Sequence, residues 1–549
     1  MIFIHNYAPK YTAKLIELGI AKKGDGFKIS QHYATPEEMR FNNVAKKDGE
    51  LYKIVKELGS CFYIDRLQGG TFYSEYDYEE ELLSEYEKLC DFLGFQLHEL
   101  GTTRMLDWNR IDRQLKAFGY EKTEENIIEA VRAVSANKVV LHFSQGRPSE
   151  YAQKEMPKTL TEAFDDIKSV LENAIKRTKN RVFNCDAGTM LAAIDTTLNL
   201  PLSFIEVGCQ TKFSRTQYAL RRGASRAVGA KWGAYLEPWS HMANGTTCYC
   251  FMRDGSNEWN VQGEGFAYHH DGERGGSSMS YAKRMMYYTL FSGADYFSEE
   301  WGQSNTFYDF ESFELSPYGR IKKEFCDFAT DFKNVKAYAP IAIVIPREYG
   351  VLNTHTRVFP YETVIDDTKT KRRMETAERL ASFIYNKSNL GSEDEYFSNG
   401  VLPSIFDVIF EDSYEKIPES YELIIDLSGM IQKSDRTIDG WSDEVFDKIK
   451  EFKEKKMPVK ISATADLDYT IFTNNEKKYA AVFNHAGVSK TVEHGESTNP
   501  EACVFLSANA KNGKITKLYN LSNSDCSLEN GKLSGSLQGG EFILFEYEE

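Results

Sequence analysis

Five short apolar runs in this chain end in the same way. Each run meets an acidic residue, and Gly or Pro stands within a few positions after it. A carboxylate is costly to bury without a partner. An acid at the end of a buried strand is therefore expected to face a partner group or a ligand. The repetition predicts that five strands present carboxylates at one place. The five stretches are GFQLHELG (94–101), RVFNCDAG (181–188), SFIEVGCQ (203–210), GAYLEPWS (233–240) and ADYFSEEWG (294–302).

Strand-type runs alternate with amphipathic helical patterns from residue 1 to about residue 335. About eight strands that alternate with helices over this length predict a (β/α)8 TIM barrel, whose active site lies at the carboxyl ends of its strands. Such a barrel explains the repeated acids, because the strand ends converge on one mouth. The predicted strands lie in MIFIH, FKISQHY or KVVLHFSQ, CFYIDRL, GFQLHEL, RVFNCDA, SFIEVG, WGAYLEP and ADYFSEE.

The numbering of the strands depends on which of two runs is counted. If KVVLHFSQ is a strand in place of FKISQHY, Glu99 ends the third strand. If FKISQHY is the second strand, Glu99 ends the fourth, and residues 102–180 form a long insertion rich in helical patterns. We favour this second count. It places the five acids at the ends of strands four to eight, in the order Glu99, Asp186, Glu206, Glu237 and Glu300.

The pattern changes twice after residue 335. Residues 336–462 carry apolar runs in AYAPIAIVIP, SYELIIDLSG and KKMPVKISA with helical patterns among them, which predicts a small doubly wound, flavodoxin-like α/β domain. No glycine-rich phosphate-binding motif accompanies these runs, so nothing indicates a nucleotide. Residues 463–549 consist of short alternating runs separated by turn residues, which predicts a C-terminal β-sandwich. We therefore expect a catalytic barrel over residues 1–335 followed by two accessory domains.

Composition restricts the partners of the chain. The 549 residues carry a net charge of -16. A protein that binds nucleic acid or an anionic membrane surface needs a basic face. We expect neither as a partner, and assembly into a homo-oligomer stays open. No apolar run reaches the length of a membrane span, and the first residues lack the features of a signal peptide, which favours a cytoplasmic protein unless a leader has been removed. The nine cysteines are scattered, and their spacing predicts no metal site.

Paired carboxylates are what hydrolysis of a glycosidic bond requires. One gives a proton to the leaving oxygen, and the other attacks the anomeric carbon or activates a water. Glu99 stands at an apolar strand end, where burial favours the protonated carboxyl that a proton donor needs. Asp186 and Glu206 fall on neighbouring strand ends, so they could act together on one water. Glu237 is the fourth catalytic candidate, although Glu237-Pro238 is also a common structural turn.

Aromatic side chains gather around the same strand ends. Flat apolar faces beside carboxylates are typical of a site for sugar rings, so we expect these aromatic residues to contact a carbohydrate substrate. Of the consecutive Glu299 and Glu300, only one can face the barrel axis, and we expect the other to meet a helix or an arginine. The expected substrate-binding side chains are His98, Arg66, Trp108, Tyr235, Trp239, Glu300 and Trp301.

Part of the predicted barrel resembles a known enzyme family. LGFQLHELG, RVFNCDAG, SFIEVGCQ and the stretch from Glu206 through RTQYALRRGASRAVGAKWGAYLEPW are similar to the catalytic barrel of family 98 glycoside hydrolases, as is SYAKRMMYYTLFSGADYFSEEWG. Those enzymes are inverting endo-β-galactosidases that act on complex glycans. The likeness covers roughly residues 90–302. It implies that Glu99 matches the general acid and that Asp186 and Glu206 match the carboxylates that activate water.

The predicted accessory domains are instead similar to those of family 42 β-galactosidases, which are retaining enzymes. That resemblance places the acid and the nucleophile on strands four and seven, here Glu99 and Glu237, but those enzymes have Asn where this chain has His98. The sequence therefore predicts a glycosidase of a β-galactoside or related glycan, without a cofactor and with inversion slightly favoured. A metal-dependent hydrolase and a catalytically inactive glycan-binding barrel are the alternatives.

Overall fold

The chain forms two compact units in the computed structural model. We call Ile2–Glu206 together with Glu348–Arg373 the N-terminal unit, and Met1 together with Val207–Arg347 and Met374–Glu549 the C-terminal unit. The structure describes residues 1–30, 37–65, 78–134, 147–187, 192–208, 214–237, 240–241, 247–248, 279–300, 302–307, 311–347, 368–384, 398–416, 419, 421–491 and 495–549.

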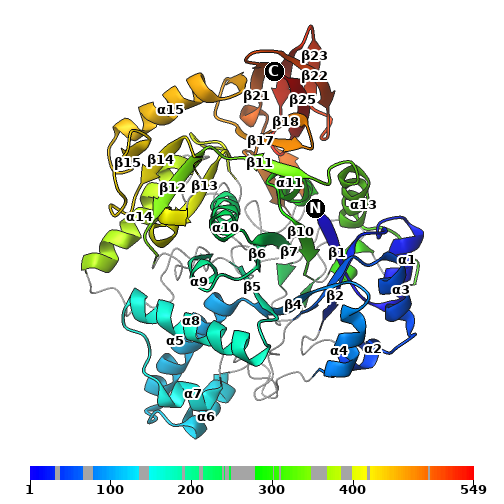
Figure 1. The fold of residues 1–549 in the computed structure, drawn as a ribbon, viewed down its shortest axis with the longest axis vertical. Coiled ribbons are helices and arrows are strands. Elements are labelled where there is room, and N and C mark those ends of the chain that lie inside the picture. Colours follow the sequence, from blue (N-terminus) through cyan, green and yellow to red (C-terminus); the bar gives the residue numbers. More distant parts are fainter. Residues whose placement is uncertain are drawn as a thin grey trace. The chain divides into compact units, whose positions relative to one another are not determined.

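Eight parallel strands close into a barrel, which confirms the (β/α)8 fold predicted from the sequence (Figure 1). FKIS forms the second strand, so the favoured count is correct and Glu99 follows the fourth strand. The run KVVLHFSQ lies outside the described residues. The barrel strands are β1 (Ile2–Asn6), β2 (Gly26–Ser30), β3 (Cys61–Asp65), β4 (Asp91–His98), β5 (Val182–Ala187), β6 (Leu202–Gly208), β7 (Lys231–Glu237) and β10 (Tyr296–Glu299).

Helices α8 and α13 begin at residues whose side chains cap the first turn, Thr159 and Ser316. At the start of α8 the Thr159 hydroxyl accepts from the backbone N–H of Glu162, whose carboxylate accepts from the N–H of Thr159, which is a capping box.

Among the described helices, none combines the length and apolar content of a membrane span. The helices are α1 (Pro9–Glu17), α2 (Phe41–Val44), α3 (Glu50–Leu58), α4 (Glu80–Glu87), α5 (Leu100–Phe118), α6 (Glu124–Val134), α7 (Pro148–Gln153), α8 (Leu160–Arg177), α9 (Ala192–Thr197), α10 (Ser214–Val228), α11 (Met279–Phe291), α12 (Gly302–Thr306), α13 (Pro317–Ala329), α14 (Thr368–Ile384) and α15 (Glu444–Lys456).

Alternation along β3 shows which side chains face the barrel interior. Phe62 packs into the core that β3 shares with α3 and α4, so its neighbours Tyr63 and Asp65 face inward. Inside the barrel, the ring centroid of Tyr63 lies 5.3 Å from that of Phe183 and 6.0 Å from that of Phe204. These three rings form an aromatic layer below the carboxyl ends of the strands. The next inward-facing residue, two positions further along each strand, therefore lies above this aromatic layer.

A parallel sheet of four strands follows the barrel, in the order β13-β12-β14-β15. A sheet order in which the chain starts near the middle is typical of doubly wound domains, as predicted. Two of its strands lie in the apolar runs expected to form them, and SIFDVIF supplies a third that was not predicted. The strands are β12 (Ile341–Ile345), β13 (Phe406–Phe410), β14 (Leu423–Asp426) and β15 (Thr437–Asp439).

Two antiparallel sheets agree with the predicted C-terminal β-sandwich, in the orders β11-β17-β18-β25-β22 and β16-β21-β24-β23. The prediction that KKMPVKISA joins the parallel sheet is wrong, because its residues form β16 and pair antiparallel with β21. The strands of these two sheets are β11 (Val335–Tyr338), β16 (Val459–Ala463), β17 (Asp468–Asn474), β18 (Lys477–Phe483), β21 (Val504–Ala510), β22 (Lys514–Tyr519), β23 (Asp525–Glu529), β24 (Lys532–Leu537) and β25 (Phe542–Glu548). Separate two-stranded sheets are formed by β8 (Ser240–His241) with β9 (Thr247–Cys248) and by β19 (Val488–Thr491) with β20 (Gly495–Thr498).

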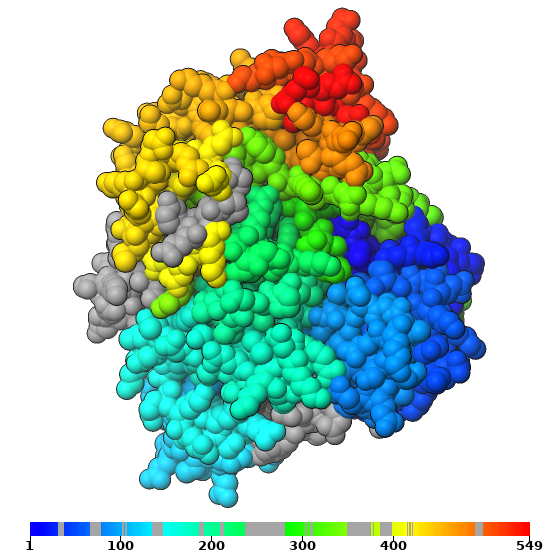
Figure 2. Space-filling view, in the orientation of Figure 1, coloured from blue at the N-terminus to red at the C-terminus, as the bar shows by residue number. Residues whose placement is uncertain are grey.

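Helix α10 connects the barrel to both accessory parts within the C-terminal unit. Arg222 donates from Nε to Oδ1 of Asp407 on β13 at 2.6 Å. Arg215 pairs with Asp468 of β17 at 3.0 Å, and both side chains are fully buried. At Gly223 an added Cβ would stand 2.4 Å from a backbone oxygen of β13, so the glycine permits a close approach of helix and sheet. Figure 2 shows the yellow surface of the segment after residue 398 beside the orange and red surface of the sandwich.

Candidate active site

The fourth barrel strand carries two of the predicted site residues at its carboxyl end. β4 ends at His98, and Glu99 caps the N-terminus of α5. The backbone of Glu99 has a φ of 48°, in the left-handed region, which costs about 1–3 kcal/mol for a residue other than glycine. Its N–H donates to the carbonyl oxygen of Cys185 at 2.7 Å, which ties this turn to β5. Strained residues of this kind concentrate at functional sites.

The His98 ring lies between two carboxylates. Its Nε2 atom is 3.8 Å from Oε2 of Glu99 and 3.7 Å from Oε2 of Glu206. The amide nitrogen of Gln96 lies 3.4 Å from Nδ1, on the other side of the ring from the carboxylates. The Glu99 side chain is 27% exposed, whereas that of Glu206 is fully buried. Glu99 can therefore meet a ligand from solvent, and Glu206 is shielded.

Cys185 joins His98 and Glu206 in a buried cluster. One potential ligand atom from each of the three side chains lies within 4.8 Å of the other two. Cys185 lies two residues after Phe183 on β5, and Glu206 lies two residues after Phe204 on β6, so both stand directly above the aromatic layer. A nitrogen, a thiol and a carboxylate at these separations could hold a metal ion with a small adjustment. The sequence pattern gave no signal for Cys185.

The separation of the two carboxylates bears on their chemistry. Because Oε2 of Glu99 and Oε2 of Glu206 lie 3.8 and 3.7 Å from the same nitrogen, they are at most about 7.5 Å apart. Inverting glycosidases hold their carboxyl groups roughly 6.5–9.5 Å apart, and retaining ones about 5–5.5 Å. The upper limit of about 7.5 Å between the Glu99 and Glu206 oxygens reaches into the range of inverting enzymes and also permits the shorter distance of retaining enzymes. Two carboxylates this close can act on the same glycosidic bond.

A second buried polar group lies in the N-terminal unit, on β2 and β3. Lys28 Nζ is 3.6 Å from Oδ2 of Asp65, and the Ser30 hydroxyl is 3.5 Å from the same oxygen. Lys28 and Asp65 are nearly fully buried. Asp65 shares the inward face of Tyr63, so this charged pair faces the barrel interior near the strand ends. The apolar-run pattern predicted neither residue as part of a site, although Asp65 follows the apolar run CFYI as an acid at a strand end.

The acids on β10 have separate surroundings. Glu299 is fully buried and meets α13, where it accepts from Lys322 at 2.5 Å and from the Tyr318 hydroxyl. It is therefore the acid of the pair that meets a helix, as expected for one of the two. Glu300 is 3% exposed, and its backbone N–H donates to Leu236 of β7 at 2.8 Å.

The other predicted substrate-binding residues fall into three groups. Trp108 is buried between helices, where its indole N–H donates to Asp166 at 2.8 Å and its ring contacts Tyr151, so the expectation that it stacks on a sugar is wrong. Tyr235 lies on β7 and is fully buried. Arg66, Trp239 and Trp301 lie outside the described residues.

Two of the catalytic candidates are placed by backbone alone. Asp186 is in β5 and pairs in register with Ile205 of β6, beside Glu206. Glu237 is the last residue of β7. The side chains of Asp186 and Glu237 lie outside the described ones.

The fold is similar to that of glycoside hydrolases of known structure. A catalytic mutant of a family 42 β-galactosidase from G. stearothermophilus is 10% identical, with 99% of this chain and 98% of that chain covered and a TM-score of 0.50. The catalytic module of a family 98 glycoside hydrolase from Streptococcus pneumoniae is 8% identical, with coverage of 96% and 98% and a TM-score of 0.35. At such identities the first likeness shows the fold alone, and the second carries no weight. No protein-family model matches the chain, and no curated protein matches it either.

Proposed function

We propose that this chain is a glycoside hydrolase that cleaves a β-galactoside or a related glycan with paired carboxylates. The observation that carries the proposal is the position of Glu99 and Glu206, whose carboxylates approach one nitrogen of His98 at the ends of two barrel strands. Hydrolysis of a glycosidic bond needs two carboxyl groups roughly 5–9.5 Å apart, and the upper limit of about 7.5 Å for this pair is compatible with that requirement. The barrel shared with a family 42 β-galactosidase supports the same class of reaction.

The two carboxylates take different roles in the proposed reaction. Glu99 is the partly exposed one, so it can reach the leaving oxygen and donate its proton. Glu206 is buried, and with Asp186 on the next strand it activates the water that attacks the anomeric carbon. His98 lies beside the pair, because its Nε2 atom is within 3.8 Å of both carboxylates. This assignment gives inversion at the anomeric carbon.

A retaining mechanism is the alternative within the same class. Glu237 would then be the nucleophile, since it ends the seventh strand of the barrel. An NMR time course of the first-formed anomer separates the two mechanisms, because direct attack by water inverts the anomeric centre and a glycosyl-enzyme intermediate retains it. A retained product would remove Glu206 from the role of base.

A screen of the full chain against aryl β-glycosides and β-linked galactose oligosaccharides tests the proposed activity. We expect hydrolysis that falls by roughly 10²–10⁴-fold in Glu206→Gln, as for a lost general base. Glu81→Gln, an exposed position on α4, is the matched control and should retain full activity. Binding of these sugars without any turnover by the wild-type chain would instead support a catalytically inactive glycan-binding barrel.

A metal-dependent hydrolase is a second candidate, favoured by the cluster of His98, Cys185 and Glu206. Nitrogen, sulfur and oxygen donors are those of a zinc site, and three protein ligands leave a fourth position for water. Elemental analysis of the purified protein tests this candidate. Stoichiometric zinc that falls in Cys185→Ser, with activity lost to a chelator and restored by zinc, would support it. Full activity in metal-free protein would exclude it.

A further inference from the structure

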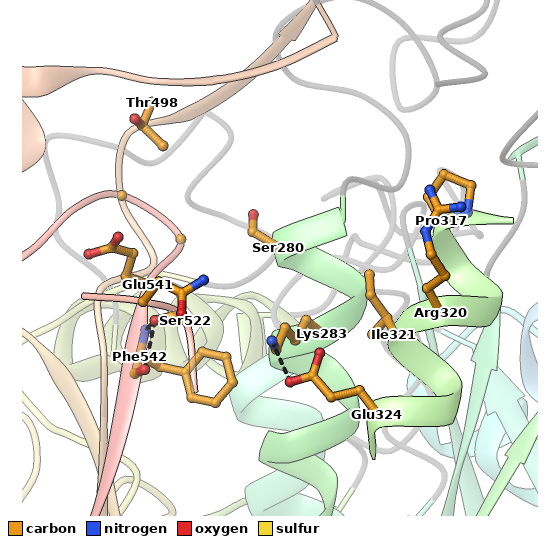
Figure 3. Close-up of a pocket in the computed structure, with 13 residues that line it drawn as sticks. Ser280, Lys283, Pro317, Arg320, Ile321, Glu324, Thr498, Ser522, Glu541 and Phe542 are labelled. Carbon is orange, nitrogen blue, oxygen red and sulfur yellow. Dashed lines mark hydrogen bonds and ion pairs between the residues drawn. The ribbon is translucent and has the colours of Figure 1, made fainter. Parts of the chain in front are cut away.

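A pocket of about 560 Å³ lies in the C-terminal unit, between two barrel helices and the sandwich (Figure 3). Ser280 and Lys283 of α11 and Arg320 of α13 line it from the barrel side. Asn523 and Glu541 line it from the loops of the sandwich. Small-molecule sites commonly have volumes of roughly 300–1,000 Å³, so the pocket has room for a ligand of the size of a short oligosaccharide.

The charges around the pocket cancel. Lys283 donates to Glu324 at 2.7 Å, and Figure 3 shows this pair on the helical side of the pocket. Arg320 and Glu541 add one charge of each sign. A lining of two cations and two anions gives no net attraction to an anionic ligand such as a phosphate, which would need a surplus of positive charge. A neutral ligand fits this balance.

The remaining lining supplies both hydrogen-bonding and apolar groups. The hydroxyl of Ser280 and the amide of Asn523 can each donate and accept, whereas the Ser522 hydroxyl donates to the carbonyl oxygen of Phe542 at 2.7 Å. Ile321 and Phe542 contribute apolar surface to the same pocket. Donors, acceptors and apolar patches interspersed in this way match the hydroxyl groups and C–H faces of a sugar, and suit neither a purely apolar ligand nor an ion.

The pocket lies at the end of the barrel where the strands finish. α11 follows β7 along the chain, and α13 follows β10, so the first turns of both helices stand near the carboxyl ends of those strands. Ser280 is in the first turn of α11, and Arg320 is close to the start of α13. The pocket is therefore on the outer wall of the barrel rather than in its interior, near the end of β10 where Glu299 meets α13.

We propose that this pocket is a secondary carbohydrate-binding site that holds a neutral oligosaccharide. The inference rests on the proposed function for the kind of sugar, and on the neutral, mixed lining for the site itself. A second sugar site can bind the same substrate molecule as the active site only if that molecule is long. The proposal therefore implies that the substrate is an oligosaccharide rather than a disaccharide.

Binding of β-1,4-galactotetraose to the full chain tests the inference. The titration is made in Glu206→Gln, so that binding is measured without turnover, and isothermal calorimetry should show two sites. Asn523→Gly removes an amide at a position with φ of 60°, where glycine adds no backbone strain, and Lys283→Met removes the cation of the ion pair. We expect each change to weaken one of the two sites by roughly two- to tenfold, as for a lost hydrogen bond.

Lys323→Met is the matched control, because Lys323 also pairs with an acid on α13 but does not line the pocket. Unchanged binding in both pocket variants, equal weakening in the control, or no binding of the tetrasaccharide would each overturn the proposal. The wild-type background separates it from the proposed function. If the chain is not a glycosidase, turnover is absent while one pocket-dependent site persists. If only the secondary site is wrong, turnover remains and the pocket variants leave the KM for galactan unchanged.

Discussion

Glu99 is the residue on which the inverting and the retaining mechanisms agree, and its leaving-group dependence can be measured. Glu99→Gln cannot give up a proton, so on substrates with poor leaving groups kcat should fall by roughly 10²–10⁴-fold. Dinitrophenyl glycosides need no protonation of the leaving oxygen, so the loss on them should be far smaller. The ratio of kcat values for the two substrate types is the measurement. Equal losses on both would contradict the role of Glu99 as proton donor.

At the same scale, sequence patterns located acids better than their partners. The apolar-run rule found Glu99 and Glu206 because a strand end is a local property of the chain. It missed Lys28, which pairs with Asp65 only after β2 and β3 come together. It also misjudged Trp108, because its neighbourhood in sequence suggested the barrel mouth, whereas its ring contacts Tyr151 of α7 and its indole N–H donates to Asp166 of α8. Partners contributed by distant segments carry no local signal.

Between elements, β10 and α13 are joined by a buried ion pair whose loss should be costly. Lys322→Met leaves the Glu299 carboxylate buried beside Tyr318 without its cation, and we expect a loss of about 3–5 kcal/mol in the free energy of unfolding. Glu299→Gln in the same chain should recover part of that loss, because a neutral amide is cheaper to bury. Urea denaturation of the single and double variants makes the comparison. A single variant as stable as the wild type would refute the pairing.

His485, directly after β18, should make the C-terminal unit sensitive to acid. Burial lowers the pKa of His485 from 6.5 to about 3, although Asp468 opposes the shift. The unfolded chain therefore takes up a proton near pH 6.5 that the folded chain refuses, so stability falls as the pH drops from about 6.5 to about 3. At pH 4.5 the loss relative to pH 7.5 should be about 2–3 kcal/mol.

His485→Gln is the variant that isolates this effect. Arg284 donates to Nδ1 of His485, and Nε2 lies 3.2 Å from Asp468, so a glutamine amide can accept from the arginine and donate to the aspartate without titrating. Urea denaturation of the wild type at pH 7.5 and 4.5 should show the loss, and the variant should lose much less between the same two pH values. Identical pH dependence in both proteins would assign the acid sensitivity to other groups.

Element assignment from sequence succeeded where burial alone sets the pattern. β12 and β14 have fully apolar cores, and such runs indicate parallel strands covered on both faces. KKMPVKISA reads as a similar run, yet most of β16 is solvent-accessible and its partner is β21, about fifty residues later. Which sheet a short strand joins depends on pairing with distant segments, and a window of sequence cannot contain that information.

At the scale of the whole molecule, α10 contacts both the parallel sheet and the sandwich within the C-terminal unit. Asp407 of β13 accepts from Arg222 and Arg226 on α10, and also from Tyr421. A third arginine of α10, Arg215, pairs with Asp468 in the sandwich. Buried pairs of this kind fix which surfaces meet more than they add stability. The three parts of this unit should therefore unfold together rather than one by one.

Gly223→Ala tests that organisation with a single methyl group. In an isolated helix this change is favourable by about 1 kcal/mol, because alanine is the better helix former. In α10 the added Cβ would stand 2.4 Å from the carbonyl oxygen of Val408, which belongs to the backbone of β13 and cannot move without shifting the sheet. We therefore expect a net loss of roughly 1–3 kcal/mol, as for an overpacked core, together with a lower Tm of the one transition that the barrel helices and the parallel sheet share. Calorimetry and urea denaturation measure both quantities. A variant stabilised by the helix-propensity gain would mean that α10 and β13 do not touch in solution, and a transition that splits in the wild type would mean that the accessory parts fold on their own.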